Sequence, residues 1–373
     1  MRSLIGCLSA LTLLAACGGQ GAAPGISGSG ATAVSSAAGS NWDQMLTAAK
    51  QEGRVSVIMP VGEATPAAMV DAFQQKYGIT VEALPSQGAE LPPRITSERN
   101  AGKYLWDISV QGITEVLTGL APIHAFDPLG PSLMLPEVTD LKNWRGGAYE
   151  FSDPDRTQMV MARTLYPTLW VNTNSLKPDE ITSYRDFLDP KWKGKFILDD
   201  PRRAGPGQAL LTLWYLTPGL GADFVRQLAK QQPLLLTNFQ QEADMLGQGA
   251  YPVLLGGSDH SIDVLIKKGV PIAVVPPTQL KEPPQVAAGS TGLSIFNRAL
   301  HPNAAKVYAN WLLTKDAQTG FARALQTISA RVDVPTDHVE SWRVPVPNAI
   351  KTYGPEVLAA RGDVVNLAKE AFQ

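Results

Sequence analysis

The chain has 373 residues, 44% of them hydrophobic and 18% charged, and 32 Lys and Arg against 34 Asp and Glu give a formal net charge of -2. This length and hydrophobic content are sufficient for roughly two globular domains, each with its own core. A nearly neutral balance without runs of Lys or Arg argues against nucleic acid as a partner.

The first residues are organised like a signal peptide. Arg2 precedes an apolar run from Leu4 to Leu14, which is too short to span a bilayer as a mature helix. The next residues, Leu14-Ala15-Ala16-Cys17, resemble the lipobox of bacterial lipoproteins. That resemblance implies a signal peptide over 1–16, acylation of Cys17 with chains such as palmitate, and a location in the cell envelope, on the periplasmic or extracellular face. The alternative is an ordinary secretory signal with an incidental cysteine.

Only Cys7 and Cys17 are present, so removal of the signal would leave one cysteine, and that one would carry lipid. No disulfide, thiolate catalyst or cysteine metal site could then form. Residues 17–40 follow, mostly Gly, Ala and Ser with a lone Pro24 and no charged residue, which predicts a flexible linker between the lipid and a folded body that begins near Asn41.

The body alternates strands with helices, which predicts an α/β fold with parallel strands. In the first part we expect helices at 43–52, 66–77, 90–101 and 114–120, and strands at 54–59, 79–84 and 106–110. In the second part we expect strands at 168–172, 196–198, 251–255, 272–275 and 285–295, and helices at 208–215, 222–230, 240–247, 302–313 and 355–372.

Loops that leave the carboxyl ends of parallel strands gather at one edge of the sheet and form a ligand crevice. Three loops of the first part qualify, and each contains a glycine that lets backbone amides approach a ligand, although a glycine in a plain turn is the alternative for each one. Their candidate ligand-binding residues are Gly62, Glu63, Ser86, Gly88, Gln111 and Gly112.

The tract Asp189-Pro190-Lys191-Trp192-Lys193-Gly194-Lys195-Phe196 resembles the iron-type branch of the extracellular solute-binding proteins, the receptors of bacterial ABC importers. Weaker resemblance extends over 86–95, 301–313 and 331–335. It implies a two-lobed periplasmic-binding-protein-like fold of type II, with interlobe hinge strands and a solute between the lobes. Lobe 1 would comprise 41–110, 113–123 and 285–331, and lobe 2 would comprise 124–284 and 332–373. Trp192 would then be a packing element.

The same resemblance implies a binding protein and not an enzyme. It would need no cofactor, would act as a monomer, and would have ABC transporter permease subunits and a small-molecule ligand as partners, with the membrane reached through the lipid anchor.

Ferric-iron members of that branch use a His, a Glu and an adjacent Tyr pair, and no such pair occurs in this chain, which argues against direct iron coordination. In its place stand Ser258, Asp259 and His260, which could hydrogen-bond a ligand. Asp259, His260 and Asp263 have metal-ligand spacing, but without a second cluster we predict no metal site.

Arg202 and Arg203 precede Gly205 at a predicted strand-to-helix turn, where free backbone N–H groups and guanidinium both favour an anion. The alternative is a solvated basic turn balanced by Asp199 and Asp200. Tyr166 and Trp170 could add an aromatic wall near the interlobe crossing, although a tryptophan is more often core.

Three hypotheses for function follow. The preferred one is a receptor for a small organic anion, such as a carboxylate or phosphorylated metabolite, and the second is a receptor for a ferric chelate held through its carboxylates. The third, a secreted α/β hydrolase or transferase, lacks a Gly-x-Ser-x-Gly elbow, a His-Glu-x-x-His helix, a P-loop and a usable cysteine.

Overall fold

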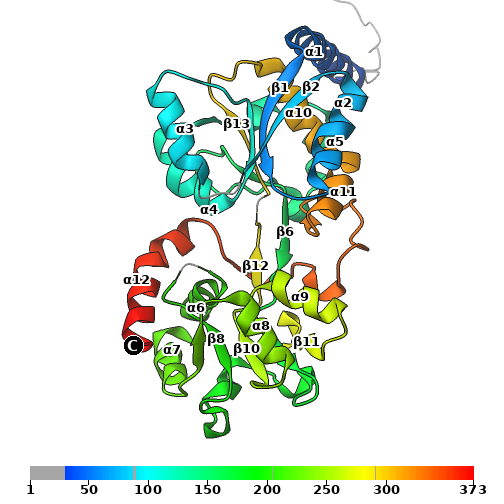
Figure 1. The fold of residues 1–373 in the computed structure, drawn as a ribbon. Helices are drawn as coiled ribbons and strands as arrows, with labels where there is room; N and C mark the ends of the chain where they lie inside the picture. Colours follow the sequence, from blue (N-terminus) through cyan, green and yellow to red (C-terminus); the bar gives the residue numbers. More distant parts are fainter. Residues whose placement is uncertain (1–29, 87–89, 204, 290) are drawn as a thin grey trace, which may run out of the picture.

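The chain forms two α/β lobes joined by a narrow waist (Figure 1). The structure is a computed structural model that describes residues 30–86, 90–203, 205–289 and 291–373, with the backbone alone for 30–40. Each lobe has its own sheet, and a third, smaller sheet lies between them.

The first lobe is built on a six-stranded sheet in the order β2-β1-β3-β13-β4, with β5 also paired to β13. Its strands are β1 (Arg54–Pro60), β2 (Thr80–Ser86), β3 (Ile108–Gln111), β4 (Phe126–Asp127), β5 (Met159–Val160) and β13 (Gly292–Phe296). Its helices are α1 (Gly30–Glu52), α2 (Ala72–Tyr77), α3 (Leu91–Asn100), α4 (Ile113–Glu115), α5 (Pro136–Thr139), α10 (Pro302–Leu312) and α11 (Lys315–Ala324). One-turn π-helical stretches precede α2 and follow α4.

The second lobe is built on a five-stranded sheet in the order β11-β7-β10-β8-β9. Its strands are β7 (Leu169–Asn172), β8 (Ile197–Asp199), β9 (Leu234–Leu236), β10 (Val253–Leu255) and β11 (Ile272–Val274). Its helices are α6 (Pro206–Leu216), α7 (Gly221–Ala229), α8 (Phe239–Gly247), α9 (Asp259–Lys267) and α12 (Pro355–Ala371). Trp192 is 7% exposed and its ring lies 5.2 Å from that of Phe187, so the expected packing role is confirmed.

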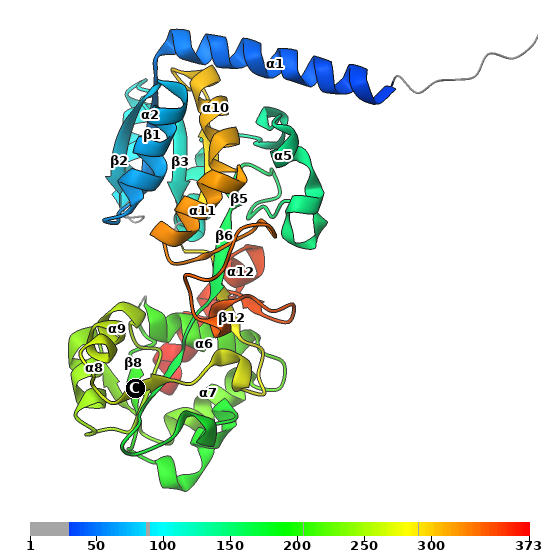
Figure 2. The same cartoon turned by 90° about the vertical axis from the view of Figure 1, so that its right-hand side faces the viewer.

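The waist is a four-stranded sheet in the order β14-β6-β12-β15 (Figure 2). Its strands are β6 (Ala162–Leu165), β12 (Gln285–Ala287), β14 (Ile328–Ser329) and β15 (Ile350–Lys351). The strands β6 and β12 are antiparallel and lead directly into strands of both lobe sheets. Short extended crossings of this kind are typical of the hinges between domains.

Strand direction differs from the expectation. β1, β2 and β3 are parallel, but β13 is antiparallel to β3, and β7 is antiparallel to both β10 and β11. The reason is that β13 and β7 enter their sheets from the waist strands β12 and β6 and not through a crossover helix, so the right-handed parallel connection does not apply to them.

Two boundaries also differ from the expectation. Leu129, Trp144 and Met159 are buried in the core of the first lobe, so the segment from 124 to the waist packs there and not in the second lobe. The helix α1 begins at Gly30, inside the stretch expected to be a flexible linker. Alanine, the strongest helix former, recurs from Ala31 to Ala38, and no proline lies between Gly30 and Glu52 to stop the helix.

Candidate binding site between the lobes

A cavity of about 930 Å³ lies between the two lobes. Four parts of the chain line it: the end of β1, the two waist crossings, the helix α9, and the segment that returns from the first lobe to the second. These are Pro60, Val61, Thr164, Tyr166, Asp259, Asp263, Ile266, Lys267, Ala287, Ala288, Gly289, Thr291, Leu325, Gln326, Thr327, Asp337, His338, Val339, Glu340 and Arg343. Because both lobes contribute, movement of one lobe against the other changes the size of the cavity.

The position of this cavity agrees with the rule that ligands bind at the carboxyl ends of strands. Val61 follows β1, and Asp259 lies four residues beyond the end of β10. A second interlobe cavity, of about 690 Å³, lies beside β15 and is lined by residues such as Glu150, Pro218 and Asn348, which follow no strand of the parallel core. The first cavity is therefore the better candidate for a solute.

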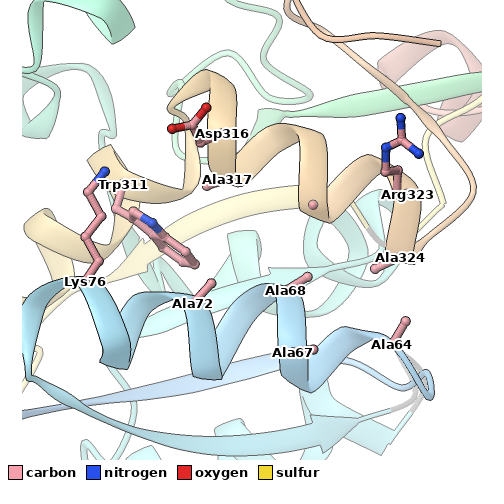
Figure 3. A pocket seen from close by; sticks show the side chains of 11 residues that line it. Ala64, Ala67, Ala68, Ala72, Lys76, Trp311, Asp316, Ala317, Arg323 and Ala324 are labelled. Atoms are coloured by element: carbon pink, nitrogen blue, oxygen red, sulfur yellow. The ribbon is translucent and has the colours of Figure 1, made fainter. Parts of the chain in front are cut away.

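A third cavity, of about 560 Å³, lies on the outer side of the first lobe between α11 and the π-helical turn that leads into α2 (Figure 3). Alanine side chains, including Ala64, Ala68 and Ala72, form its wall, and Lys76, Asp316 and Arg323 lie along its edge. No residue of the second lobe lines it, so closure of the lobes would not enclose a molecule there.

The helix α9 presents one charged face to the interlobe cavity. Asp259, Asp263 and Lys267 are spaced four residues apart, and such residues lie above one another on a helix. The helix starts here because Ser258 has an extended backbone at the N-cap position and Asp259 lies in the first turn, where the helix dipole favours an acidic residue. Beside this face Ile262 is fully buried and packs in the core of the second lobe.

Arg343 joins α9 to the returning segment. Its Nη1 and Nη2 donate to the two carboxylate oxygens of Asp259 at 2.9 and 3.2 Å, and its Nε donates to Glu340 at 2.8 Å. Burial alone lowers the pKa of Arg343, but the hydrogen bonds that it donates to Asp259 and Glu340 outweigh burial and leave the pKa above its ordinary value. The guanidinium therefore stays charged, and with its two carboxylate partners it forms a cluster with one net negative charge.

Asp263 is the carboxylate of this cavity that lacks a partner. It is half-buried, and within the described residues its side chain makes no hydrogen bond or ion pair. Burial raises its pKa, and the neighbouring charge of Asp259 raises it further. A positive charge placed beside Asp263 would relieve both effects.

His338 brings an imidazole to the same cavity from the returning segment. Its Nε2 lies 2.8 Å from the carbonyl oxygen of Thr327, and because a carbonyl only accepts, Nε2 carries the proton. In the neutral ring Nδ1 is then an acceptor. The side chain is 5% exposed, and Nδ1 has no hydrogen-bond partner in the part of the chain that the structure describes.

The two aromatic residues that were predicted to form a wall of the site lie in different surroundings. Tyr166 lines the cavity, and burial, followed by the charge of Asp259, raises its pKa to about 12, so its hydroxyl stays protonated. Trp170 is 1% exposed and packs in the core of the second lobe with residues such as Ile197 and Leu254. Its assignment to an aromatic wall is wrong, because its position in β7 directs the ring into the sheet's hydrophobic layer.

The three loops predicted in the first lobe do gather at one edge, since β2, β1 and β3 are parallel neighbours. Gly62 and Glu63 are exposed just beyond Val61, the loop residue that lines the cavity. Ser86 is half-buried at the end of β2, and Gly88 lies outside the described residues.

Gln111 and Gly112 are both buried at the end of β3, where Gly112 precedes the first turn of α4. The side-chain amide of Gln111 has no partner among the described residues, although it is fully buried. Buried amide atoms are normally hydrogen-bonded, so Gln111 is an exception.

Arg202 and Arg203 have different surroundings. Arg202 donates to both carboxylate oxygens of Asp200 at 2.8 and 2.7 Å and to the carbonyl oxygen of Phe372 at 2.8 Å, which fastens this turn to the end of the chain. Arg203 is exposed, and its side chain makes no hydrogen bond or ion pair within the described residues. Of the two, Arg203 is the one whose guanidinium is available to a ligand.

The turn that contains Gly205 contacts the loop after β10. A Cβ on Gly256 would lie 2.9 Å from the Cα of Gly207, and the Gly207 amide donates to Asp199 at 2.6 Å. Gly205 is half-buried at the start of α6 and Ser258 half-buried at the start of α9, whereas His260 is exposed in the first turn of α9. The two loops predicted for the second lobe are thus neighbours, but Asp259 is the predicted residue among them that lines the cavity.

Beneath this turn lies a pair of buried carboxyl groups. Glu242 of α8 is fully buried, and burial together with the neighbouring Asp199 raises its pKa to about 8. Burial also raises the pKa of Asp199. The pair holds a proton at neutral pH, because two ionised carboxylates cannot share a dry site.

Sequence reasoning missed most of the cavity lining. Arg343, Glu340 and His338 lie in a stretch with little regular structure, and no pattern in the sequence places them opposite α9. Asp263 had a usable signal, the four-residue spacing from Asp259 along a helix, but we considered it there only as a metal ligand.

Two further findings concern metals and membranes. Within residues 30–86, 90–203, 205–289 and 291–373, no group of three or more His, Cys, Asp or Glu side chains has the arrangement of a metal site. Among the helices in the same ranges, none has the length and apolar character needed to cross a bilayer.

Two α/β lobes, a waist of short crossing strands and a cavity between the lobes define the class of periplasmic binding proteins, and solved structures of that class superpose on this chain. A FutA protein of Trichodesmium, in complex with iron and citrate, matches with a TM-score of 0.62 at 15% identity, over 86% of this chain and 99% of its own. AfuA of Actinobacillus pleuropneumoniae, with fructose-6-phosphate bound, matches with a TM-score of 0.57 at 15% identity, over 86% of this chain and 98% of its own. An ABC transporter protein of Clostridium perfringens matches with a TM-score of 0.65 at 16% identity, over 86% of this chain and 100% of its own.

At these identities the superpositions show the fold alone. No curated protein matches the sequence. The family is shown by the sequence itself: residues 68–345, more than half of the chain, match the family of bacterial extracellular solute-binding proteins, and the chain belongs to that family.

Proposed function

We propose that this protein captures a small polar solute in the interlobe cavity and delivers it to the permease subunits of an ABC importer. The observation that supports this most is the lining of that cavity, which comes from both lobes and from both waist crossings. A solute that touches Val61 or Gln326 of the first lobe and α9 of the second favours the closed form, because it makes contacts there that the open form lacks.

The importer in turn needs a way to recognise the loaded receptor. Closure about the waist changes the spacing of the outer surfaces of the two lobes, and permease subunits that fit the closed spacing bind the loaded form preferentially. The protein needs no catalytic step for this role.

The solute class follows less directly. A small organic anion, or a ferric chelate held through its carboxylates, is a candidate supported by Arg203, whose exposed guanidinium lies at the turn before α6. Arg202 gives this candidate little support, because its donors already bind Asp200 and Phe372.

The membrane connection is part of the same proposal. The lipobox-like Leu14-Ala15-Ala16-Cys17 supports acylation of Cys17, and several acyl chains would hold the two lobes beside the membrane that contains the importer. Mass spectrometry of the N-terminal peptide is expected to show diacylglyceryl-modified Cys17, and Cys17→Ser is expected to release the protein from membranes. An unmodified Cys17 in a membrane fraction would contradict the anchor while leaving the receptor proposal intact.

Thermal unfolding with a panel of polar metabolites tests the receptor proposal directly. A solute bound at one site stabilises the folded chain by RT ln(1 + [L]/Kd), so a solute at about 100 times its Kd is expected to raise the free energy of unfolding by about 2.7 kcal/mol. The solute should also be recovered unchanged. Product formation from the solute would revive the hydrolase or transferase alternative.

A further inference from the structure

The two lobes contribute unequally to the charge of the interlobe cavity. The lining of the first lobe consists of uncharged residues such as Val61 and Gln326, whereas α9 and the returning segment contribute Asp259, Asp263, Lys267, Asp337, Glu340 and Arg343. Four carboxylates therefore stand against two cations in the lining. Chemical selection in this cavity depends on the second-lobe side.

Pairing shows which of these charges a solute would meet. Arg343 binds both Asp259 and Glu340, and Arg323, which does not itself line the cavity, binds Asp337 at 2.8 Å. With Arg323 included, four carboxylates face three cations, which leaves one excess negative charge. The unpaired groups are the half-buried Asp263 and the exposed Lys267, and the buried charge is screened less by solvent and salt.

His338 gives a second observation, which favours a solute with hydrogen-bond donors. His338 lines the cavity, and its Nε2 donates to Thr327. Its Nδ1 is buried and makes no hydrogen bond within the described residues, and the nearest charged group, Asp337 Oδ1, lies 3.9 Å away. A neutral imidazole in this tautomer offers a lone pair and no proton to the cavity. In the neutral ring, the group that satisfies Nδ1 is a hydrogen-bond donor.

We propose that the cavity selects a solute with a protonated primary or secondary amine, which Asp263 pairs with and to which His338 Nδ1 is an acceptor. This inference rests on the proposed function, since it assigns the solute class to the same cavity. It runs against the organic-anion hypothesis, which depends on Arg203 outside the cavity lining. A quaternary ammonium, which has no N–H, would satisfy Asp263 but not His338.

A matched series of four-carbon compounds tests the sign of the preferred charge. 1,4-Diaminobutane, 1,4-butanediol and succinate have similar length and are cationic, neutral and anionic. At concentrations on the order of 10 mM, we expect the diamine to raise the Tm and the diol and succinate to leave it unchanged. A rise with succinate but not with the diamine overturns the amine assignment, and so does a series in which no compound raises the Tm.

Two substitutions of opposite sign on the same helix face sharpen the test. Asp263→Asn removes the unpaired carboxylate and is expected to weaken binding of the diamine by about tenfold or more. Lys267→Gln removes the competing positive charge and is expected to strengthen it by about twofold, less at high salt. Calorimetry measures both affinities. Stronger binding by Asp263→Asn and weaker binding by Lys267→Gln would show an anion site.

A control keeps the two proposals separate. Asp316→Asn removes an acidic residue of the first lobe that does not line the interlobe cavity, so it should leave the affinity for the diamine unchanged. If a broad panel of metabolites stabilises the protein while the diamine does not, the receptor proposal stands and the amine assignment fails. If neither the panel nor the series stabilises it, the receptor proposal itself is contradicted.

Discussion

The two walls of the interlobe cavity differ in kind. The first-lobe wall consists of the end of β1 and of residues 325–327, all uncharged, whereas the second-lobe wall carries the ion-paired cluster of Arg343, Asp259 and Glu340 beside the unpaired Asp263. In a receptor of this design the charged wall selects the solute, and the neutral wall adds contact area when the lobes close. Substitutions on the charged wall should therefore change which solute binds, and substitutions on the neutral wall should change the contact area gained when the lobes close.

The largest effect on stability is expected on the charged wall. Arg343→Ala leaves Asp259 and Glu340 without their partner in a partly buried position, and is expected to lower the free energy of unfolding by about 2–3 kcal/mol. Arg323→Ala, which breaks the exposed pair with Asp337, is the matched control and should cost about 0.5 kcal/mol. Denaturant titrations measure both, and equal losses would show that Arg343 does not organise the wall.

A smaller effect is expected on the pH dependence of the free energy of unfolding, and it arises from the carboxyl pair in the second lobe. The pKa of Glu242 is raised from 4.5 to about 8, so the folded chain keeps a proton that the unfolded chain releases above pH 4.5. The free energy of unfolding therefore falls as the pH rises from about 4.5 to about 8. Glu242→Gln is neutral throughout, so we expect it to flatten this fall and to raise the Tm at pH 8 by about 2–4 °C.

Thermal unfolding at a series of pH values gives the result, with the exposed Glu370→Gln as control. Glu370 pairs with Arg226 on the protein surface, and its substitution should leave the shape of the profile between pH 5 and about 8 unchanged. A native profile that is flat in this range would contradict the assignment of a shared proton to Asp199 and Glu242.

The smallest effect separates the two arginines of the turn before α6. Arg202→Ala removes the bonds to Asp200 and Phe372 and is expected to lower the free energy of unfolding by about 1 kcal/mol without changing affinity for the solute. Arg203→Ala should change stability by less than about 0.5 kcal/mol. If Arg203→Ala weakens solute binding about tenfold, the anion hypothesis is restored and the amine assignment is contradicted.

Much of the fold could be predicted because its signals are local. Strand-helix alternation predicted β1 to α4 and the helices α6, α7 and α8, but not the strand β9 between α7 and α8. The tract around Trp192 indicated the family. Strand direction in β13 and β7 could not be predicted, since it depends on how the waist strands enter each sheet. The lobe boundary expected near residue 124 was wrong for a similar reason. Leu129 and Trp144 are hydrophobic and could pack in the core of either lobe, and tertiary packing alone places them in the first.

The binding site was less predictable than the fold. Asp259 and Tyr166, which follow or adjoin recognisable strands, do line the cavity. Trp170 was misassigned because an aromatic residue beside a cleft looks the same in sequence as one in a core. The ion pair of Arg343 with Asp259 joins residues 84 positions apart. Contacts of that range are fixed by tertiary structure and leave no periodic signal.

Distance measurement between the lobes tests the central claim most directly. Spin labels at Gln75→Cys on α2 and Gln241→Cys on α8, both exposed, in a chain with Cys7 and Cys17 replaced by Ser, report the separation of the lobes in solution. On addition of a solute that raises the Tm, the account predicts a distance distribution that shifts by several ångströms, since the lobes close about the waist. An unchanged distribution in the presence of a stabilising solute would contradict it.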